Sequence, residues 1–172
     1  AQDNKVIIPQ VFSEYSSKRV LTLSYEGGDG IADTKHYPAA IRNEIGERLF
    51  HVLCEQMYHL QALHCDSHPG NFAFRPDGSL VIYDFGCVKR LNPLLVGEMK
   101  RLVKAALAND YATVESALRD LGIRTQIGEV PPEYYLEWIA ILLAPLQDKT
   151  FDFGHSQVHE QVLKQIKSLM KY

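Results

Sequence analysis

The stretch "HCDSHPGNFAFRPDGSLVIYDFG", which runs from His64 to Gly86, decides the fold that the sequence predicts. Its first part is polar, and Pro69 and Gly70 cannot continue a helix, so we expect a loop there. Two short apolar runs follow, "FAF" at 72–74 and "LVIYDF" at 80–85, and the Asp77-Gly78 pair between them is typical of a tight turn. The stretch therefore predicts a polar loop and then a β-hairpin that ends in Asp-Phe-Gly.

Three polar side chains of this stretch have a spacing that suits phosphoryl transfer. Asp66 and Asn71 lie five positions apart, and Asp84 lies thirteen positions after Asn71. A hairpin brings its two ends together, so we expect the loop and Asp84 to be neighbours. Such a site needs one carboxylate that orients the nucleophile or accepts its proton, and hard oxygen ligands that hold magnesium against the phosphates. The spacing predicts Asp66 in the first role and Asn71 and Asp84 as the ligands; an exposed loop and a turn residue is the plainer interpretation.

A second Asp-Phe-Gly occurs at 152–154, in "KTFDFGHSQV". No Asp-x-x-x-x-Asn loop stands before it, because the preceding segment has the pattern of a helix. We expect Asp152 to cap or precede a helix that starts near His155, with Gly154 in the connecting turn. Only the first copy is predicted to bind metal.

The flanking sequence predicts a few strands followed by a mass of helices. The segments 6–12 and 19–25 read as an antiparallel strand pair, and the glycines of "YEGGDG" end it. An apolar stripe predicts a helix from about Tyr37 to Leu63. Four more apolar stripes predict helices at 93–109, 111–121, 132–146 and 155–170. The fold class is therefore α+β and mainly helical.

Composition excludes several classes of protein. The net charge of −3 does not favour nucleic acid as a partner. The longest apolar run, "WIAILLAPL" from Trp138, is nine residues long and far too short to span a membrane. Three cysteines without a C-x-x-C pattern favour reduced thiols in a cytosolic setting. We expect Cys65 and Cys87, which flank the predicted site, to be small buried thiols, with a redox or metal role as the alternative.

The stretch from His64 to Gly86 resembles the UbiB (AarF-type) atypical kinase family, in which a His-x-Asp-x-His-Pro-Gly-Asn loop precedes Asp-Phe-Gly. The likeness extends upstream through "IIPQVFSEYSSKRVLTLSYEGG" and downstream through "GCVKRLNPLLVGEMKRLVKAALANDYATVESALRDLGI", so it covers roughly Val6 to Ile123. The resemblance implies a protein-kinase-like fold, with residues 1–28 ending the small lobe and residues 29–172 forming a helical large lobe. It also implies ATP and magnesium as cofactors, kinase or ATPase activity, and support of ubiquinone biosynthesis on the cytoplasmic side of a membrane, with a lipid or quinone precursor and the membrane surface as partners.

Family roles carry over position by position. Asp66 takes the role of the catalytic-loop aspartate, and Asn71 and Asp84 become the metal ligands. The hinge that meets the adenine falls on four consecutive residues: Ser24, Tyr25, Glu26 and Gly27. His68 lies where protein kinases keep a lysine, and it either donates a hydrogen bond to phosphate or braces the loop.

The sequence also departs from the kinase pattern. After Gly86 there is no long activation segment and no Ala-Pro-Glu. The resemblance places the phosphate-covering loop and the ATP lysine before the hinge, and the chain starts too late to contain them. We therefore expect a piece of a longer protein, inactive as residues 1–172 alone.

Three other functions remain open at the level of sequence. A small-molecule kinase of the aminoglycoside or choline type has a similar catalytic loop. A non-catalytic pseudokinase scaffold would keep the motif without turnover. A zinc site is the third alternative, with His64, Asp66 and His68 at alternate positions.

Overall fold

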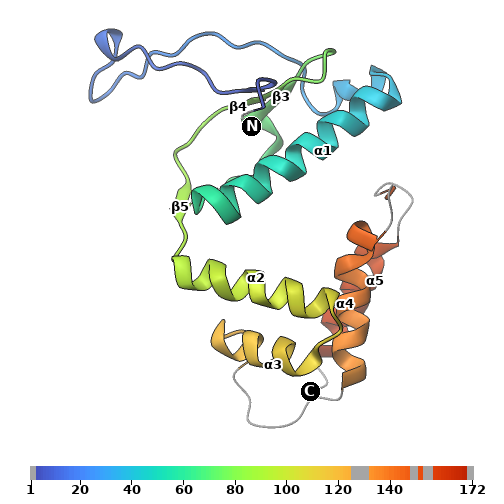
Figure 1. Cartoon of the computed structure of the whole chain (residues 1–172). Helices are drawn as coiled ribbons and strands as arrows, with labels where there is room; N and C mark the ends of the chain where they lie inside the picture. The colour runs from blue at the N-terminus through green and yellow to red at the C-terminus, as the bar shows by residue number, and fades with distance from the viewer. Residues whose placement is uncertain (1–2, 125–131, 148–150, 153–156, 170–172) are drawn as a thin grey trace. The chain divides into compact units, whose positions relative to one another are not determined.

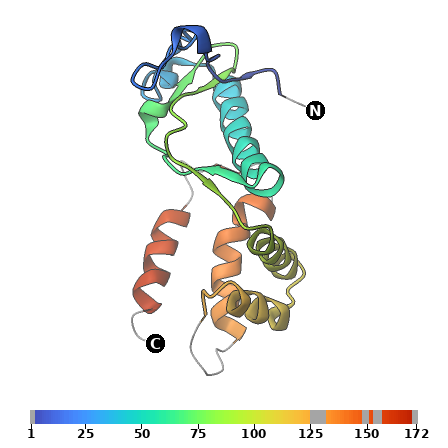
Figure 2. The same ribbon diagram turned by 90° about the vertical axis from the view of Figure 1, so that its left-hand side faces the viewer.

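The computed structural model describes residues 3–124, 132–147, 151–152 and 157–169 (Figure 1). The chain forms two compact units, residues 1–96 and residues 97–172. The first unit contains the short strands and the longest helix, and the second unit is helical (Figure 2). The division into lobes at residue 28 stays a prediction.

The predicted hairpin is present at the centre of the first unit. Strands β3 (Phe72–Phe74) and β4 (Leu80–Ile82) are antiparallel, with Phe74 opposite Leu80. In the turn, Gly78 has φ +85° and donates its N–H to the Arg75 carbonyl. Glycine adopts this left-handed conformation without the strain that a side chain would add, which is why Asp-Gly suits this turn.

Helix α1 (Ala39–Glu55) packs on this sheet and buries its apolar stripe. The three residues of β4 are at most 2% exposed, because β4 has a strand on each side and α1 supplies part of the core. The core cluster consists of five buried residues: Tyr37, Ile45, Phe74, Leu80 and Ile82. The hairpin that carries the predicted site is thus fixed to the best-buried part of this unit.

The N-terminal strand pair forms only in part. Strand β1 (Val6–Ile7) pairs in parallel with β4 rather than with the segment at 19–25. Beyond it, Val11 and Leu23 form an isolated antiparallel bridge, and Ser17 and Val20 form another. Pro9, which has no N–H to donate, separates β1 from the bridge at Val11. Short 3₁₀ turns follow at η1 (Ser13–Tyr15) and η2 (Asp33–His36).

The long helix ends earlier than the predicted Leu63. After α1 the chain takes a π-helical turn, η3 (Gln56–Leu60), and Gln61 then adopts φ 50° and ends the helical run. Residues 62–64 form β2 (Ala62–His64), which pairs antiparallel with β5 (Val88–Arg90). The sequence did not predict this ladder. Its strand β2 lies just before the Asp66–Asn71 loop, and its strand β5 lies just after the Asp-Phe-Gly segment.

The four predicted C-terminal helices are present with slightly different bounds. They are α2 (Pro93–Leu107), α3 (Tyr111–Asp120), α4 (Pro132–Gln147) and α5 (Val158–Leu169). The second unit has a core of its own, made of five buried residues: Ala105, Ala106, Val114, Tyr135 and Leu143. Asp152 precedes α5, whereas Phe153 and Gly154 lie outside the described residues. Among the described residues, no helix combines the length and apolarity that crossing a bilayer requires.

Candidate functional site

The loop Asp66–Asn71 is held together by hydrogen bonds to the Asp66 carboxylate. The His68 N–H donates to Oδ1 at 3.1 Å, and the Asn71 Nδ2 donates to Oδ2 at 2.8 Å. A carboxylate only accepts, so the amide nitrogen of Asn71 has to face Asp66. The amide oxygen of Asn71 is thereby left available for another partner.

The same bonds fix the charge of Asp66. The backbone N–H of His68 and then the side chain of Asn71 hold the pKa of the Asp66 carboxyl below its ordinary value of 3.8. Both donors stabilise the ionised form. Asp66 is therefore a carboxylate at neutral pH, suited to accept a hydrogen bond from a nucleophile.

The hairpin brings Asp84 to this loop, as the spacing predicted. The Tyr83 N–H donates to the Asn71 carbonyl at 2.8 Å. Asp84 is the next residue along the chain, so this bond keeps it near Asn71. Asp84 has φ 46°, an uncommon conformation for a residue with a side chain, and its Oδ1 accepts the Gly86 N–H at 2.9 Å. The described hydrogen bonds use Oδ1 and not Oδ2, which leaves one exposed carboxylate oxygen beside the loop.

His64 joins the two halves of the site, a role that the sequence did not indicate. Its Nε2 lies 2.9 Å from the Asp84 carbonyl oxygen, and the Asp66 N–H donates to its Nδ1 at 3.3 Å. A carbonyl accepts, so Nε2 carries the ring proton. The ring also packs against Phe72 and edge-on against Phe85. The His64 ring thus connects the backbones of Asp66 and Asp84.

His68 braces the loop. Its Nδ1 accepts the Gly70 N–H at 3.1 Å, at the start of the 3₁₀ turn η4 (Pro69–Asn71). A Cβ on Gly70 would lie 3.0 Å from this nitrogen, so the glycine allows the close approach. In the neutral ring the proton is then on Nε2, which leaves a donor for an anion. The structure supports the bracing role and is compatible with the phosphate role.

The donor set fits magnesium. Asn71 offers an amide oxygen and Asp84 offers a carboxylate oxygen, both of which are hard ligands. Magnesium in phosphoryl-transfer sites takes one or two protein carboxylates and completes its shell with phosphate oxygens and water. The predicted zinc alternative is wrong: the described residues contain no group of three or more His, Cys, Asp or Glu that could hold a metal ion. His64 uses both ring nitrogens, and His68 uses Nδ1, in bonds to the backbone instead.

The predicted hinge, Ser24–Gly27, is fastened to the hairpin. Arg75 forms an ion pair with Glu26 at 2.9 Å and donates from Nε to the Gly27 carbonyl at 2.8 Å. The Tyr83 hydroxyl donates to the Glu26 carbonyl. Tyr83, which precedes the metal-ligand candidate Asp84, therefore also binds the hinge.

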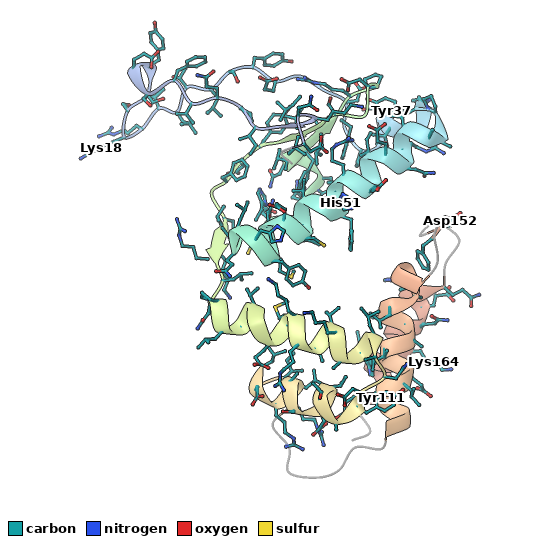
Figure 3. The ribbon with its side chains drawn as sticks, in the orientation of Figure 1. Lys18, Tyr37, His51, Tyr111, Asp152 and Lys164 are labelled. Carbon is teal, nitrogen blue, oxygen red and sulfur yellow. The ribbon has the colours of Figure 1, made fainter. Side chains whose placement is uncertain are left out.

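Close backbone packing at Gly28 also holds the predicted hinge against the hairpin. A Cβ on Gly28 would lie 2.9 Å from both the Ala73 Cβ and the Phe74 carbonyl oxygen. Tyr37, which is labelled in Figure 3, has its hydroxyl oxygen 2.7 Å from the Asp29 carboxylate and 3.1 Å from the Phe74 carbonyl oxygen, so its one proton is shared between the two acceptors. Burial and the Asp29 carboxylate raise the pKa of Tyr37 to about 12, so it stays a donor at any physiological pH.

The expectation that Cys65 and Cys87 are buried is wrong. Both thiols are exposed, and Cys54 is partly buried. Cys65 follows the last residue of β2 and Cys87 precedes the first residue of β5, so both flank the site at the end of this ladder.

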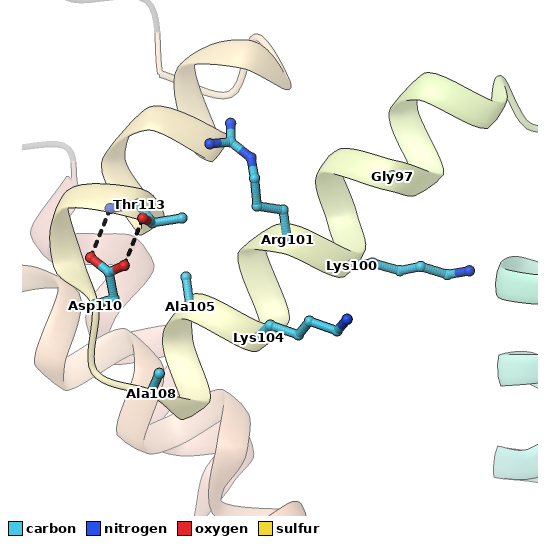
Figure 4. Close-up of a pocket in the computed structure, with 8 residues that line it drawn as sticks. All are labelled: Gly97, Lys100, Arg101, Lys104, Ala105, Ala108, Asp110 and Thr113. Carbon is cyan, nitrogen blue, oxygen red and sulfur yellow. Dashed lines mark hydrogen bonds between the residues drawn. The ribbon is translucent and has the colours of Figure 1, made fainter.

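An open hollow of about 470 Å³ lies in the second unit (Figure 4). Its lining includes the cationic residues Lys100, Arg101 and Lys104. Arg101 forms ion pairs with Glu98 and Asp120, and Asp110 accepts from the N–H and the hydroxyl of Thr113. None of the predicted site residues lines this hollow.

Comparison with known proteins identifies the class and then the family. A solved structure of Rv3197 from Mycobacterium tuberculosis, determined with erythromycin, matches with a TM-score of 0.75 at 23% identity, over 92% of this chain and 40% of that one. The chain therefore shares the fold of that structure. Residues 1–118 match the model of the ABC1 atypical kinase-like domain, so the chain belongs to that family and its α+β fold is kinase-like.

Curated relatives agree with this assignment, and the UbiB resemblance is confirmed at the level of the family. An ABC1 family protein of Schizosaccharomyces pombe is 31% identical over 70% of this chain and 24% of its own length. The mitochondrial atypical kinase COQ8B of Danio rerio is 23% identical over 99% of this chain and 28% of its own length. The chain thus spans about a quarter of the length of these relatives.

Proposed function

We propose that this chain supplies the magnesium-binding and catalytic side of an ATP site in an ABC1-type kinase or ATPase. Asn71 and Asp84 are the metal ligands in this proposal, and Asp66 orients the attacking nucleophile. The single observation that carries it is the hydrogen-bond network in which Asp66 is bonded to Asn71 and Asn71 is bonded to Tyr83, the neighbour of Asp84. This network supports the proposal because it holds the Asn71 amide, the Asp66 carboxylate and the segment that carries Asp84 next to one another.

The chemistry assigned to each residue follows from its bonds. The two donors to Asp66 keep it ionised, so it acts through the hydrogen bond that it accepts from the nucleophile and is a weak proton acceptor. Bound magnesium would neutralise charge on the phosphates. In this proposal His68 braces the loop through Nδ1 and donates from Nε2 to a phosphate oxygen.

The hinge is proposed to hold the adenine. Its carbonyls at Glu26 and Gly27 already accept bonds from Tyr83 and Arg75, and the Ser24 N–H donates to the Gln10 carbonyl. Adenine offers one donor and one acceptor on neighbouring atoms. The N–H groups of Glu26 and Gly27 and the carbonyls of Ser24 and Tyr25 are the backbone groups that could meet them.

Family membership suggests a biosynthetic process for this chain as well as a type of reaction. The UbiB resemblance and the similarity to COQ8B support a role in the biosynthesis of isoprenoid quinones such as ubiquinone. A lipid or quinone precursor at a membrane surface is the substrate class that we propose.

The test compares the two Asp-Phe-Gly aspartates in the longest form of the protein that carries this sequence. Asp84→Asn keeps the acceptor for the Gly86 N–H but removes the charge that meets the metal. We expect it to weaken ATP binding about tenfold or more in magnesium, equivalent to about 1.4 kcal/mol, with little change in EDTA. Isothermal titration measures both conditions.

Asp152→Asn is the matched control, because it makes the same chemical change in the same tripeptide. It should leave both affinities unchanged. Equal losses from the two substitutions would contradict the assignment of Asp84. Magnesium-dependent binding without phosphate release or transfer would instead identify a non-catalytic scaffold.

A further inference from the structure

Cys65 and Cys87 are partners across the ladder of β2 and β5. In this antiparallel pair, His64 lies opposite Val88. One step further along both strands, the Cys65 N–H donates to the Cys87 carbonyl at 2.8 Å. The two cysteines therefore occupy directly opposed positions at the end of the ladder.

Opposed positions place the two side chains on the same face of the ladder. In an antiparallel pair the Cα atoms of hydrogen-bonded partners are about 5.5 Å apart and the Cβ atoms about 4.5–5.5 Å apart. A disulfide needs Cα atoms about 4.4–6.8 Å apart and Cβ atoms about 3.5–4.5 Å apart. The backbone spacing is thus already suitable, and closing the bond requires the Cβ atoms to approach by about 1 Å. Both residues are exposed, so an oxidant in solution can reach them.

We propose that Cys65 and Cys87 form a thiol modification site, a dithiol that disulfide oxidants such as glutathione disulfide convert to an intramolecular disulfide. The thiolate of one cysteine attacks a sulfur of glutathione disulfide, the glutathione S–S bond breaks, and one glutathione thiolate leaves. The second cysteine then attacks the mixed disulfide and releases the second glutathione. The protein loses two protons and two electrons, and the oxidant becomes two molecules of glutathione.

The site is built for reversal. Closing the bond strains the ladder, and strained, exposed disulfides have higher reduction potentials than structural ones. The strands end one residue short of this pair, since β2 ends at His64 and β5 begins at Val88, so the bond would form at the end of the ladder rather than within it.

Oxidation would act on the proposed ATP site, and this part of the inference rests on the proposed function. Cys65 immediately precedes Asp66, and Cys87 immediately follows Gly86, whose N–H bonds Asp84. Drawing the two cysteines together displaces both segments toward each other. We expect the oxidised protein to bind magnesium-ATP several-fold more weakly than the reduced protein.

The first measurement concerns the thiols alone. The protein is equilibrated in glutathione buffers of increasing oxidising strength, acid-quenched and analysed by intact mass and peptide mapping. We expect a loss of about 2 Da and a peptide cross-link between Cys65 and Cys87 that dithiothreitol removes. Cys65→Ser and Cys87→Ser should each abolish the cross-link, and Cys54→Ser should not, because Cys54 lies on α1 and is partly buried. Free or separately glutathionylated Cys65 and Cys87 at the oxidising end would overturn the proposal.

The second measurement separates this inference from the proposed function. Affinity for ATP, with and without magnesium, is determined for the reduced and the oxidised protein, with Cys87→Ser in the same buffers as control. A cross-link with no magnesium-dependent binding in either state would refute the proposed function and leave the thiol site standing. Magnesium-dependent binding without a cross-link would refute the thiol site, and a cross-link with unchanged affinity would refute its effect on the ATP site.

Discussion

The hydrogen bond between Asp66 and Asn71 affects both side chains. The His68 backbone N–H, and after it the amide nitrogen of Asn71, lower the pKa of the Asp66 carboxyl, and the bond from Asn71 leaves its amide oxygen available for another partner. If the amide were reversed, two oxygens would face each other and the contact would be repulsive. The orientation of Asn71 is therefore a consequence of the charge on Asp66.

Removing the amide should change the titration of Asp66. In Asn71→Ala the carboxylate loses its side-chain donor and keeps the His68 N–H, so its pKa should rise toward 3.8 without passing it. Carboxyl-carbon NMR over a pH series measures the change. Ser67→Ala, in the same exposed loop, is the control and should leave the titration as it was. An unaltered pKa in Asn71→Ala would show that the backbone donor alone sets the charge.

The lowered pKa of Asp66 sets the pH range in which its charge changes. A carboxyl whose pKa is depressed by folding contributes stability that is present above its ordinary value of 3.8 and is lost as the pH falls through the folded value. Asp66 should therefore cause no change in magnesium-ATP affinity between about pH 5 and pH 8. An acid limb within that range has to come from another group.

The hinge and the hairpin work as one element because three kinds of contact join them. They are the ion pair of Arg75 with Glu26, the bond from the Tyr83 hydroxyl, and the close backbone approach at Gly28. The three residues of β4 are buried, so the proposed hinge and the proposed metal ligand Asp84 are both attached to a well-packed strand.

Gly28→Ala should break this attachment. The new Cβ would lie 2.9 Å from the Phe74 carbonyl oxygen, which belongs to a paired strand and cannot move aside cheaply. We expect a loss of about 1–3 kcal/mol in the free energy of unfolding, together with weaker ATP binding both with and without magnesium. Urea denaturation and isothermal titration measure the two effects.

Gly46→Ala is the matched control. Gly46 is an exposed residue of α1, and a Cβ there meets nothing within 4 Å. The same chemical change should stabilise the protein by about 0.5–1 kcal/mol, since alanine is the better helix former. A similar response at both glycines would mean that the contact at Gly28 is not tight in solution.

Local sequence predicted the elements whose signals are local. The hairpin followed from Asp77-Gly78 between two apolar runs, and the helices followed from their stripes. The ladder of β2 and β5 was missed because each strand has only three residues and its partner is more than twenty positions away. The extra length predicted for α1 has a similar cause, since a π-turn keeps apolar residues in helical spacing while it ends the α-helix.

The candidate site also has features that local sequence predicts and features that it does not. The spacing of Asp66, Asn71 and Asp84 predicted that the loop and the end of the hairpin would be neighbours. Asn71 bonds Asp66 through its side chain and Tyr83, the residue before Asp84, through its backbone carbonyl. The bridging role of His64 depends on where its ring lies between two backbones, which no spacing rule encodes. The exposure of Cys65 and Cys87 likewise depends on tertiary cover rather than on residue type.

Every predicted site residue falls within the first unit, from Ser24 to Asp84. The second unit has a separate core and a hollow lined by Lys100, Arg101 and Lys104. ATP therefore has two candidate binding places, the proposed site in the first unit and this basic hollow in the second. Magnesium distinguishes the two places. Lysine and arginine side chains bind phosphate directly, whereas Asn71 and Asp84 would bind it only through a magnesium ion.

Hydrogen exchange should therefore locate ATP in the first unit. With magnesium-ATP, amide protection should rise in residues 64–71 and 83–88, which carry the catalytic loop and the Asp-Phe-Gly segment, and in the hinge at 24–27. Ligand binding stabilises the state that it selects, so the increase should grow with ligand concentration and disappear in EDTA. Asp84→Asn should remove this protection, and Asp152→Asn should preserve it. Protection confined to residues 97–113 and insensitive to EDTA would place the nucleotide on the lysine-lined hollow of the second unit, and the proposed roles of Asn71 and Asp84 would then be wrong.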